Sequence, residues 1–359
     1  MDTKPSDLIP LNSLSERMAL ADKLRHLKPA IAESVTTEFF QRHPDWVARY
    51  GERGRNLGIE DACFHLDFLA GALEAGSVTP FEDYVHWTAR MLGARNIAAH
   101  FVAENLEQIE SALASHLTAP EAEYVTRFTV AGRLACSGPP EEDRAEAGKR
   151  GLELVCSLFL QAILENQRKA AVTVILEALR DGHLATDIYV EVLQESLYQV
   201  GRLWESNRIT VAEEHMATAI TQYVMAQLYP RLPPATQTRG SMVITGVAGE
   251  LHQVGANMVA DVLDAQGYDV RFLGTNTPHS GIVQAIEEHE ADVLGVSATM
   301  LFNIPHVVEL IEEVRSRLGE RSPRMVLGGA AFRSLPSLTA ELGAIGYASD
   351  LRAAVRMLC

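Results

Sequence analysis

From Ser241 onward the chain alternates short apolar runs with helical patterns, and this alternation restricts its fold more than any other feature. Five strand-and-helix pairs in about 120 residues are typical of a doubly wound parallel sheet with helices on both faces. The expected strands are residues 242–245, 270–273, 293–296, 325–327 and 344–347. Ligands bind such sheets beyond the carboxyl ends of the strands. We therefore expect a site in the loops that follow these strands.

An all-helical region comes first in the chain. Residues 1–136 carry apolar residues at three- and four-residue spacing with few β-branched alternations, which predicts a helical N-terminal domain. Breaks between its helices are expected at His43–Pro44, at Gly51–Gly58 and at Gly76–Pro80. Two prolines and a run of charged residues in 137–150 indicate a linker after this domain.

A second helical region separates the linker from the sheet. Apolar periodicity predicts helices at 151–179, 186–204 and 211–228, with short connections between them. Long antiparallel helices with short connections form a bundle, which we assign to residues 151–235. The expected fold class is therefore α/β plus all-α: a helical N-terminal domain, a four-helix bundle and, in residues 240–359, a doubly wound, flavodoxin-like five-stranded parallel sheet.

Composition excludes several classes of function. The net charge of −16 opposes binding to phosphate backbones, so we expect no direct contact with nucleic acid. No apolar run approaches the roughly 18 residues of a membrane span, and the polar N-terminus does not resemble a signal peptide. We therefore expect a cytoplasmic protein without a membrane partner. Four cysteines without paired spacing argue against disulfides and against a thiolate metal site.

The loop after the first expected strand carries the most informative side chains. Gly249 and Gly255 enclose His252 and place it where the carboxyl edge of the sheet meets the next helix. Histidine is the side chain of this loop that binds a metal at neutral pH. A carboxylate such as Glu250, two residues earlier, accepts the proton of the other ring nitrogen in metal sites and fixes the tautomer. A solvated loop histidine is the alternative that this loop alone leaves open.

Two more strand-to-helix turns complete a pattern. Ser297-Ala298-Thr299 follows Gly255 after forty-one residues, and Gly328-Gly329 follows after a further twenty-eight. The whole order resembles the motif of cobalamin-binding proteins in which a histidine replaces the cofactor's own base. That motif reads Asp-x-His-x-x-Gly, then Ser-x-Thr or Ser-x-Leu, then Gly-Gly.

The resemblance implies roles for these residues. His252 would be the lower axial ligand of cobalt, and Glu250 would hold its second nitrogen. The two hydroxyls of the second turn would bind the buried nucleotide tail, and the paired glycines would leave room for it. Glu250 departs from the family's aspartate, which changes the geometry of its hydrogen bond. The cofactor-binding residues implied in this half of the site are Glu250, His252, Gly255, Ser297, Thr299, Gly328 and Gly329.

The bundle carries a second resemblance. Trp204, nine intervening residues and then Glu214-His215 are similar to a signature of CarH-type photoreceptors, whose bundle caps the upper face of adenosylcobalamin. The four residues from Thr210 form a capping-box pattern, so Glu214 and His215 are expected in the first turn of a helix. The resemblance implies that Glu214 binds the adenosyl ribose and that Trp204 packs against it. Glu205 stands where those proteins carry a histidine, so we expect a different product after photolysis.

The N-terminal domain carries no short motif. Its position before a bundle and a cobalamin domain is similar to the layout of photocobilins, which pair cobalamin with a bilin. Under this resemblance biliverdin is a second chromophore, and His65, Tyr84, His86 and Arg90 are its expected partners. The alternatives are a helical interaction or dimerisation module, and a haem site with His65 or His86 as ligand.

The leading hypothesis from the sequence is a light sensor that is not an enzyme. Light would cleave the cobalt–carbon bond of adenosylcobalamin, and the bundle or an oligomer interface would rearrange to regulate an unknown protein partner, either a transcriptional regulator or an enzyme. We expect a homo-oligomer, most simply a dimer. The alternative is a corrinoid methyl carrier of a methyltransferase system. A mutase subunit is a third reading, which requires a separate substrate-binding chain.

Overall fold

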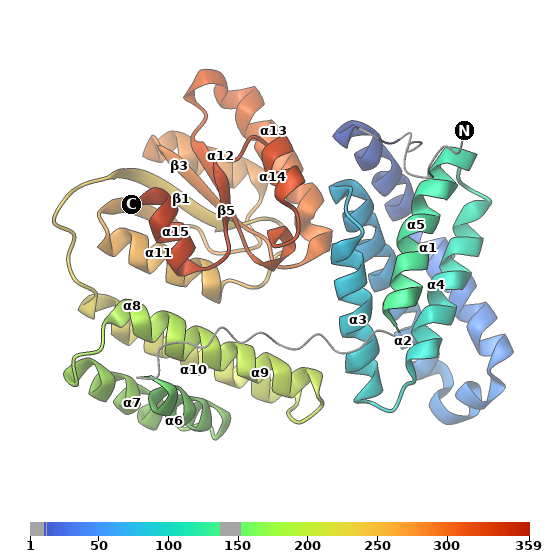
Figure 1. The fold of residues 1–359 in the computed structure, drawn as a ribbon, viewed down its shortest axis with the longest axis horizontal. Helices are drawn as coiled ribbons and strands as arrows, with labels where there is room; N and C mark the ends of the chain where they lie inside the picture. Colours follow the sequence, from blue (N-terminus) through green and yellow to red (C-terminus); the bar gives the residue numbers. More distant parts are fainter. Residues whose placement is uncertain (1–10, 12, 137–151) are drawn as a thin grey trace, which may run out of the picture. The chain divides into compact units, whose positions relative to one another are not determined.

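The computed structural model describes residue 11, residues 13–136 and residues 152–359, so the predicted linker at 137–150 lies outside the described residues. The chain divides into two compact units, shown by sequence colour in Figure 1. The first comprises Met1–Pro140 with Met300–Val308 and Ser334–Glu341. The second comprises Glu141–Thr299, Glu309–Arg333 and Leu342–Cys359.

Five helices make up the N-terminal part of the first unit. They are α1 (Leu14–Arg42), α2 (Pro44–Ala75), α3 (Thr79–Gly93), α4 (Ala99–Ala114) and α5 (Ala119–Ala135). The start of α1 is fixed by a capping box, in which the Ser13 hydroxyl accepts from the Glu16 amide and the Glu16 carboxylate accepts from the Ser13 amide. The predicted break at His43–Pro44 is confirmed, because Pro44 opens α2.

The predicted break at Gly51–Gly58 is confirmed at its first residue. Gly51, at φ 57° and ψ −151°, has a non-helical backbone and forms a kink between two helical segments of α2. Gly54 and Gly58 lie within the second of these segments. Interior glycines cost a helix only about 1 kcal/mol each, which the packing of α2 against α1 offsets.

Four helical segments form the bundle of the second unit. They are α6 (Glu153–Leu164), α7 (Arg168–Arg180), a continuous run made of α8 (Ala185–Asp187), the π-helix Ile188–Gln194 and α9 (Glu195–Glu205), and α10 (Val211–Leu228). The single helix predicted at 151–179 is wrong. Asn166, at φ 57°, adopts the left-handed conformation and separates α6 from α7. Helix α10 has the predicted bounds.

The sheet has five parallel strands in the order β2-β1-β3-β4-β5. They are β1 (Gly240–Gly246), β2 (Tyr268–Phe272), β3 (Val293–Ser297), β4 (Arg324–Gly328) and β5 (Gly346–Ala348). The helices that follow them are α11 (Val254–Ala265), α12 (His279–His289), α13 (Ile304–Leu318), α14 (Pro336–Glu341) and α15 (Leu351–Leu358). The predicted flavodoxin-like fold class is confirmed. The strand order reverses between β1 and β3, which is where such sheets bind ligands.

The register of the strands aligns their carboxyl ends. Gly246 of β1 pairs with Ser297 of β3, and Ser297 pairs with Gly328 of β4. The loops that follow these three strands therefore begin at the same edge of the sheet. The three predicted motifs lie in those loops, so the fold brings together segments that are separated by dozens of residues in the sequence.

The bundle and the sheet of the second unit share one apolar core. Helices α11 and α15 lie between the sheet and the bundle (Figure 1), and Met258, Val262 and Leu351 belong to the same buried cluster as the interior of the bundle. At this boundary the Tyr189 hydroxyl donates a hydrogen bond of 2.7 Å to Oδ2 of Asp261. Among the described residues, no helix is long and apolar enough to cross a membrane.

Candidate cofactor site at the carboxyl edge of the sheet

The loop between β1 and α11 places His252 at the edge of the sheet. Gly249 adopts φ 79°, which a residue with a side chain rarely takes, and its amide donates to Oδ1 of Asn276 at 2.9 Å. The next side chain, Glu250, is fully buried, whereas the side chain of His252 is 56% exposed. The loop therefore buries the carboxylate of Glu250 and leaves the imidazole of His252 accessible to solvent.

Glu250 holds the histidine and also ties two loops together. Its Oε1 lies 2.6 Å from Nδ1 of His252 and accepts the His252 amide at 2.8 Å. Its Oε2 accepts the amide of Thr299, in the loop after β3, at 2.6 Å. With Nδ1 engaged by the carboxylate, Nε2 is the ring nitrogen left to bind a ligand. The predicted pairing of Glu250 with His252 is present, with one more methylene than the aspartate of the motif.

These contacts shift the pKa values of both groups. Burial alone would raise the pKa of Glu250, but the hydrogen bonds from His252 and from the Thr299 amide outweigh it and lower the pKa to about 2. The hydrogen bond with Glu250 raises the pKa of His252, burial opposes this change, and the charge of Glu214 adds to the increase. Glu250 is therefore a carboxylate at neutral pH and favours a proton on Nδ1 of the imidazole.

Of the paired glycines at the end of β4, the backbone requires Gly329 but not Gly328. Gly329 adopts φ 92°, and a Cβ at this position would lie 2.2 Å from the carbonyl oxygen of Ala298. At Gly328 a Cβ would meet only the Ala348 oxygen, at 3.7 Å, and at Gly255 it would meet nothing within 4 Å. Gly329 thus serves the packing of two loops, whereas Gly255 and Gly328 border open space. Ser297 and Thr299 are partly exposed at the same edge.

The bundle contributes one charge to this edge. The capping box predicted at the start of α10 is confirmed, because the Thr210 hydroxyl accepts from the Glu213 amide and the Glu213 carboxylate accepts from the Thr210 amide. Glu214 follows in the first turn, and its charge acts on His252. The neighbouring His215 is 76% exposed and contacts Glu214 through Nδ1. Trp204 is partly buried one residue before the end of α9.

This arrangement fits a flat cofactor with a central metal. The imidazole of His252 is able to supply the metal ligand, and the buried carboxylate of Glu250 is the hydrogen-bond partner that orients such a ligand. Open space at Gly255 and Gly328 leaves room beside it. An acidic side chain of the bundle is near enough for its charge to act on the same imidazole. The residues present therefore fit the predicted base-off cobalamin site.

The four residues predicted to bind a bilin lie in two helices of the first unit. His65 of α2 is buried, and its Nδ1 lies 2.8 Å from the hydroxyl of Tyr84 in α3. Burial lowers the pKa of His65 to about 4. His86 contacts the Ala135 carbonyl through Nδ1 at 3.3 Å, and Arg90 is exposed. His65 and Tyr84 thus form a buried pair, His86 is partly buried, and Arg90 is at the surface.

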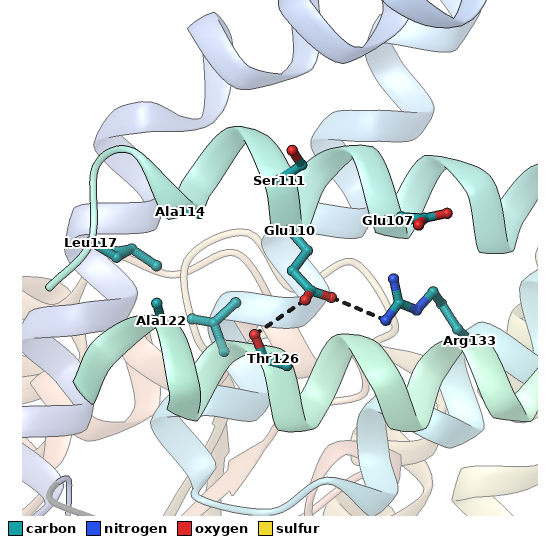
Figure 2. A pocket seen from close by; sticks show the side chains of 9 residues that line it. Glu107, Glu110, Ser111, Ala114, Leu117, Ala122, Thr126 and Arg133 are labelled. Carbon is teal, nitrogen blue, oxygen red and sulfur yellow. Dashed lines mark hydrogen bonds and ion pairs between the residues drawn. The ribbon is translucent and has the colours of Figure 1, made fainter. Parts of the chain in front are cut away.

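A pocket of about 340 Å³ lies elsewhere in this unit, between α4 and α5 (Figure 2). Its Glu110 carboxylate accepts hydrogen bonds from Thr126 at 3.2 Å and from Thr129 at 2.6 Å, and it lies 3.4 Å from the Arg133 guanidinium. None of the four predicted bilin residues lines this pocket.

Two contacts could not be found from the motif, one in the site and one at the boundary between bundle and sheet. In the site, Asn276 comes from the loop after β2, where no motif residue lies. At the boundary, Tyr189 comes from the π-helix. The available sequence signal is weak in both cases. An asparagine two residues after Gly274 suggests a left-handed turn, and an interrupted helical ladder is frequent near functional sites.

Comparison with known proteins identifies the ligand class. Residues 240–356 match the family model of the B12 binding domain, and residues 156–229 match a second model with the same description. The methionine synthase of Mycobacterium leprae is 27% identical over 224 residues, which are 60% of this chain and 18% of that protein. Dimethylamine corrinoid protein 1 of Methanosarcina mazei is 25% identical over 190 residues, 52% of this chain and 87% of that protein.

A solved structure agrees in fold. The monomethylamine corrinoid protein of Methanosarcina barkeri superposes with a TM-score of 0.52 at 22% identity and covers 57% of this chain and 97% of that one. The sheet and bundle of the second unit therefore make up B12-binding domains, and cobalamin is the class of cofactor, as predicted.

The light-sensor function predicted from the sequence is wrong. The relatives named above, a methionine synthase and two corrinoid proteins of methylamines, favour the alternative, a corrinoid methyl carrier. The prediction rested on Trp204 and the Glu214-His215 pair, two short elements on separate helices whose spacing alone does not specify a ligand.

Proposed function

We propose that this chain is a corrinoid methyl-carrier protein that serves a methyltransferase partner. The observation that carries the proposal is the pair of hydrogen bonds that buried Glu250 accepts from His252, one from its backbone amide and one from Nδ1 of its exposed imidazole. These bonds lie at the point where the strand order of a B12-binding sheet reverses. In this proposal the chain is not itself a catalyst. Its partner is a protein that supplies or receives the methyl group.

His252 is the proposed lower axial ligand. Bound cobalamin supplies the cobalt atom that accepts and releases a methyl group. Nε2 binds this metal from below, while Glu250 keeps the proton on Nδ1 and so preserves the electron pair of Nε2 for the metal. Ser297 and Thr299 offer hydroxyls to the nucleotide tail, and Gly255 and Gly328 leave the space that the tail requires.

The bundle is the proposed cover of the upper face. Trp204 supplies an aromatic surface near the end of α9, and Glu214 places a carboxylate whose charge reaches His252. A cover of this kind excludes water from a reactive metal centre. His215, which is mostly exposed and paired with Glu214, orients that carboxylate.

An electron paramagnetic resonance experiment on the Co(II) form tests the lower ligand. The full chain is loaded with cob(II)alamin after growth with natural or ¹⁵N-labelled histidine. Ligation by His252 predicts a three-line nitrogen splitting that becomes two-line with the label. In labelled His252→Ala the two-line pattern is lost, and any splitting left is the three-line pattern of the cofactor's own base. The matched control is His215→Ala, which removes another histidine of the site and keeps the two-line pattern. A two-line pattern that survives in labelled His252→Ala, or a three-line pattern in the labelled wild type, contradicts the proposal.

Titrations decide which upper ligand the site accepts. A methyl carrier binds methylcobalamin at least as tightly as adenosylcobalamin, and its oligomeric state does not change after illumination. Adenosylcobalamin specificity and biliverdin binding stay predictions. The first is tested by the ratio of the two dissociation constants, and the second by the appearance of a red absorption band with biliverdin. A strong preference for adenosylcobalamin argues against the carrier.

A further inference from the structure

We infer that Asn276 is a positioning residue for the lower cobalt ligand, and this inference rests on the function proposed above. Asn276 lies in the loop between β2 and α12, and its Oδ1 accepts the amide of Gly249 at 2.9 Å. Gly249 directly precedes Glu250, which holds His252. The bond therefore connects a second loop to the peptide between Ala248 and Gly249, one residue before the buried carboxylate.

The backbone at both ends of this bond is left-handed. Gly249 has φ 79° and Asn276 has φ 56°. Asparagine is one of the few residues with a side chain that adopts this conformation at low cost. An alanine at position 276 would lose the acceptor and strain the turn as well, so a test must separate these two effects.

The loop that carries Asn276 is anchored without it. The Gly246 amide donates to the Gly274 carbonyl at 2.9 Å, and the Thr277 amide donates to the Gly246 carbonyl at 3.4 Å. A Cβ on Gly246 would lie 2.6 Å from a methyl carbon of Thr275, so the two loops are in close contact. Asn276 thus presents its amide oxygen from a fixed support at the end of β1.

Glu250 depends on the orientation of the peptide that precedes it. Its two oxygens satisfy donors in different directions, the amide of Thr299 on one side and His252 on the other. The peptide between Gly249 and Glu250 is held by the Glu250 amide, which donates to the Val247 carbonyl at 3.1 Å. Glycine restricts its backbone weakly, so the Ala248–Gly249 peptide needs a second contact, and Asn276 supplies it. Together the two bonds keep Glu250, and through it the imidazole, in one geometry.

Three variants of the full chain separate the acceptor from the backbone. Asn276→Gly removes the acceptor and retains a left-handed turn, and Asn276→Asp restores an acceptor oxygen. The matched control is Asn166→Gly, at φ 57° in the turn between α6 and α7 of the same unit. Two readouts are needed: amide hydrogen exchange of peptides that include Gly249 in the cofactor-free protein, and the affinity and nitrogen splitting of bound cob(II)alamin.

In Asn276→Gly we expect faster exchange around Gly249, a dissociation constant for cob(II)alamin raised roughly three- to tenfold, and a broadened nitrogen splitting. Asn276→Asp restores the splitting, and Asn166→Gly behaves as the wild type. Wild-type exchange and splitting in Asn276→Gly overturn the inference. If ¹⁵N-histidine-labelled His252→Ala keeps a two-line splitting, the proposed function fails instead, and the exchange measurement still decides whether Asn276 holds the loop.

Discussion

The replacement of Glu250 by glutamine tests the central pair of the site, because the two side chains have the same shape. The carboxylate accepts three hydrogen bonds, two at Oε1 and one at Oε2. Glutamine keeps one oxygen and turns the other position into a donor. In either orientation its NH₂ group faces at least one buried N–H donor, which costs about 1–3 kcal/mol.

The pKa of Glu250 gives an independent measure of how much this carboxylate contributes to the free energy of unfolding. Its value falls from 4.5 to about 2 on folding, and this shift corresponds to about 3 kcal/mol of stability when the group is ionised. Because the folded-state pKa is lowered, this stability is present above pH 4.5 and is lost as the pH falls through 2. We therefore expect Glu250→Gln to lower the free energy of unfolding by about 2–3 kcal/mol at pH 7, and by less near pH 3.

Denaturant unfolding of the cofactor-free protein at both pH values measures this difference. The control is Glu312→Gln, which neutralises an exposed carboxylate of α13 and is expected to change the free energy by less than about 0.5 kcal/mol. Because Glu250→Gln removes the carboxylate that holds His252, we also expect the affinity for cobalamin to fall by about tenfold or more. If Glu250→Gln has the free energy of unfolding of the wild type and binds cobalamin equally well, Glu250 does not hold His252 as a metal ligand.

Three further predictions concern other parts of the chain. Gly329→Ala places a Cβ against the Ala298 carbonyl at positive φ, so we expect a loss of about 1–3 kcal/mol in unfolding free energy, whereas Gly255→Ala, which borders open space, leaves the cofactor-free protein unchanged. Burial lowers the pKa of His65 from 6.5 to about 4, so its contribution to the stability of the first unit is complete above pH 6.5. This contribution, about 3 kcal/mol in total, is lost as the pH falls toward 4. His65→Phe should flatten this pH profile of the free energy of unfolding. Thr210→Ala removes the N-cap of α10 and should cost about 1 kcal/mol, while Thr210→Ser retains the cap, as thermal unfolding of the pair will show.

The centre of the sheet was predictable because β1, β3 and β4 are buried on both faces over most of their length. Such strands read as continuous apolar runs. The expected strands correspond to β1–β5 with shifts of a few residues at their ends. The helical region was harder. Of the three glycines in Gly51–Gly58 only Gly51 interrupts the helix, whereas Glu165-Asn166-Gln167 contains neither glycine nor proline and still separates α6 from α7. In both places tertiary packing and a single left-handed residue outweighed local propensity.

The lower half of the site was more predictable than its function for a physical reason. His252, Thr299 and Gly328 follow or end strands whose register is fixed by backbone hydrogen bonds, so their spacing in the sequence determines their positions in space. Asn276 was not predicted because its side chain accepts from a backbone amide of another loop, and a bond to a backbone amide requires no particular residue type or spacing in the sequence. In the proposed site the upper face depends on Trp204 and Glu214, which lie on separate helices of the bundle. Residues that only cover a group constrain its size, whereas in a methyl carrier the group transferred is decided by the partner that reaches the metal. Under the proposed function, this chain's own residues specify the class of cofactor, and the identity of the methyl donor must be sought in the partner protein.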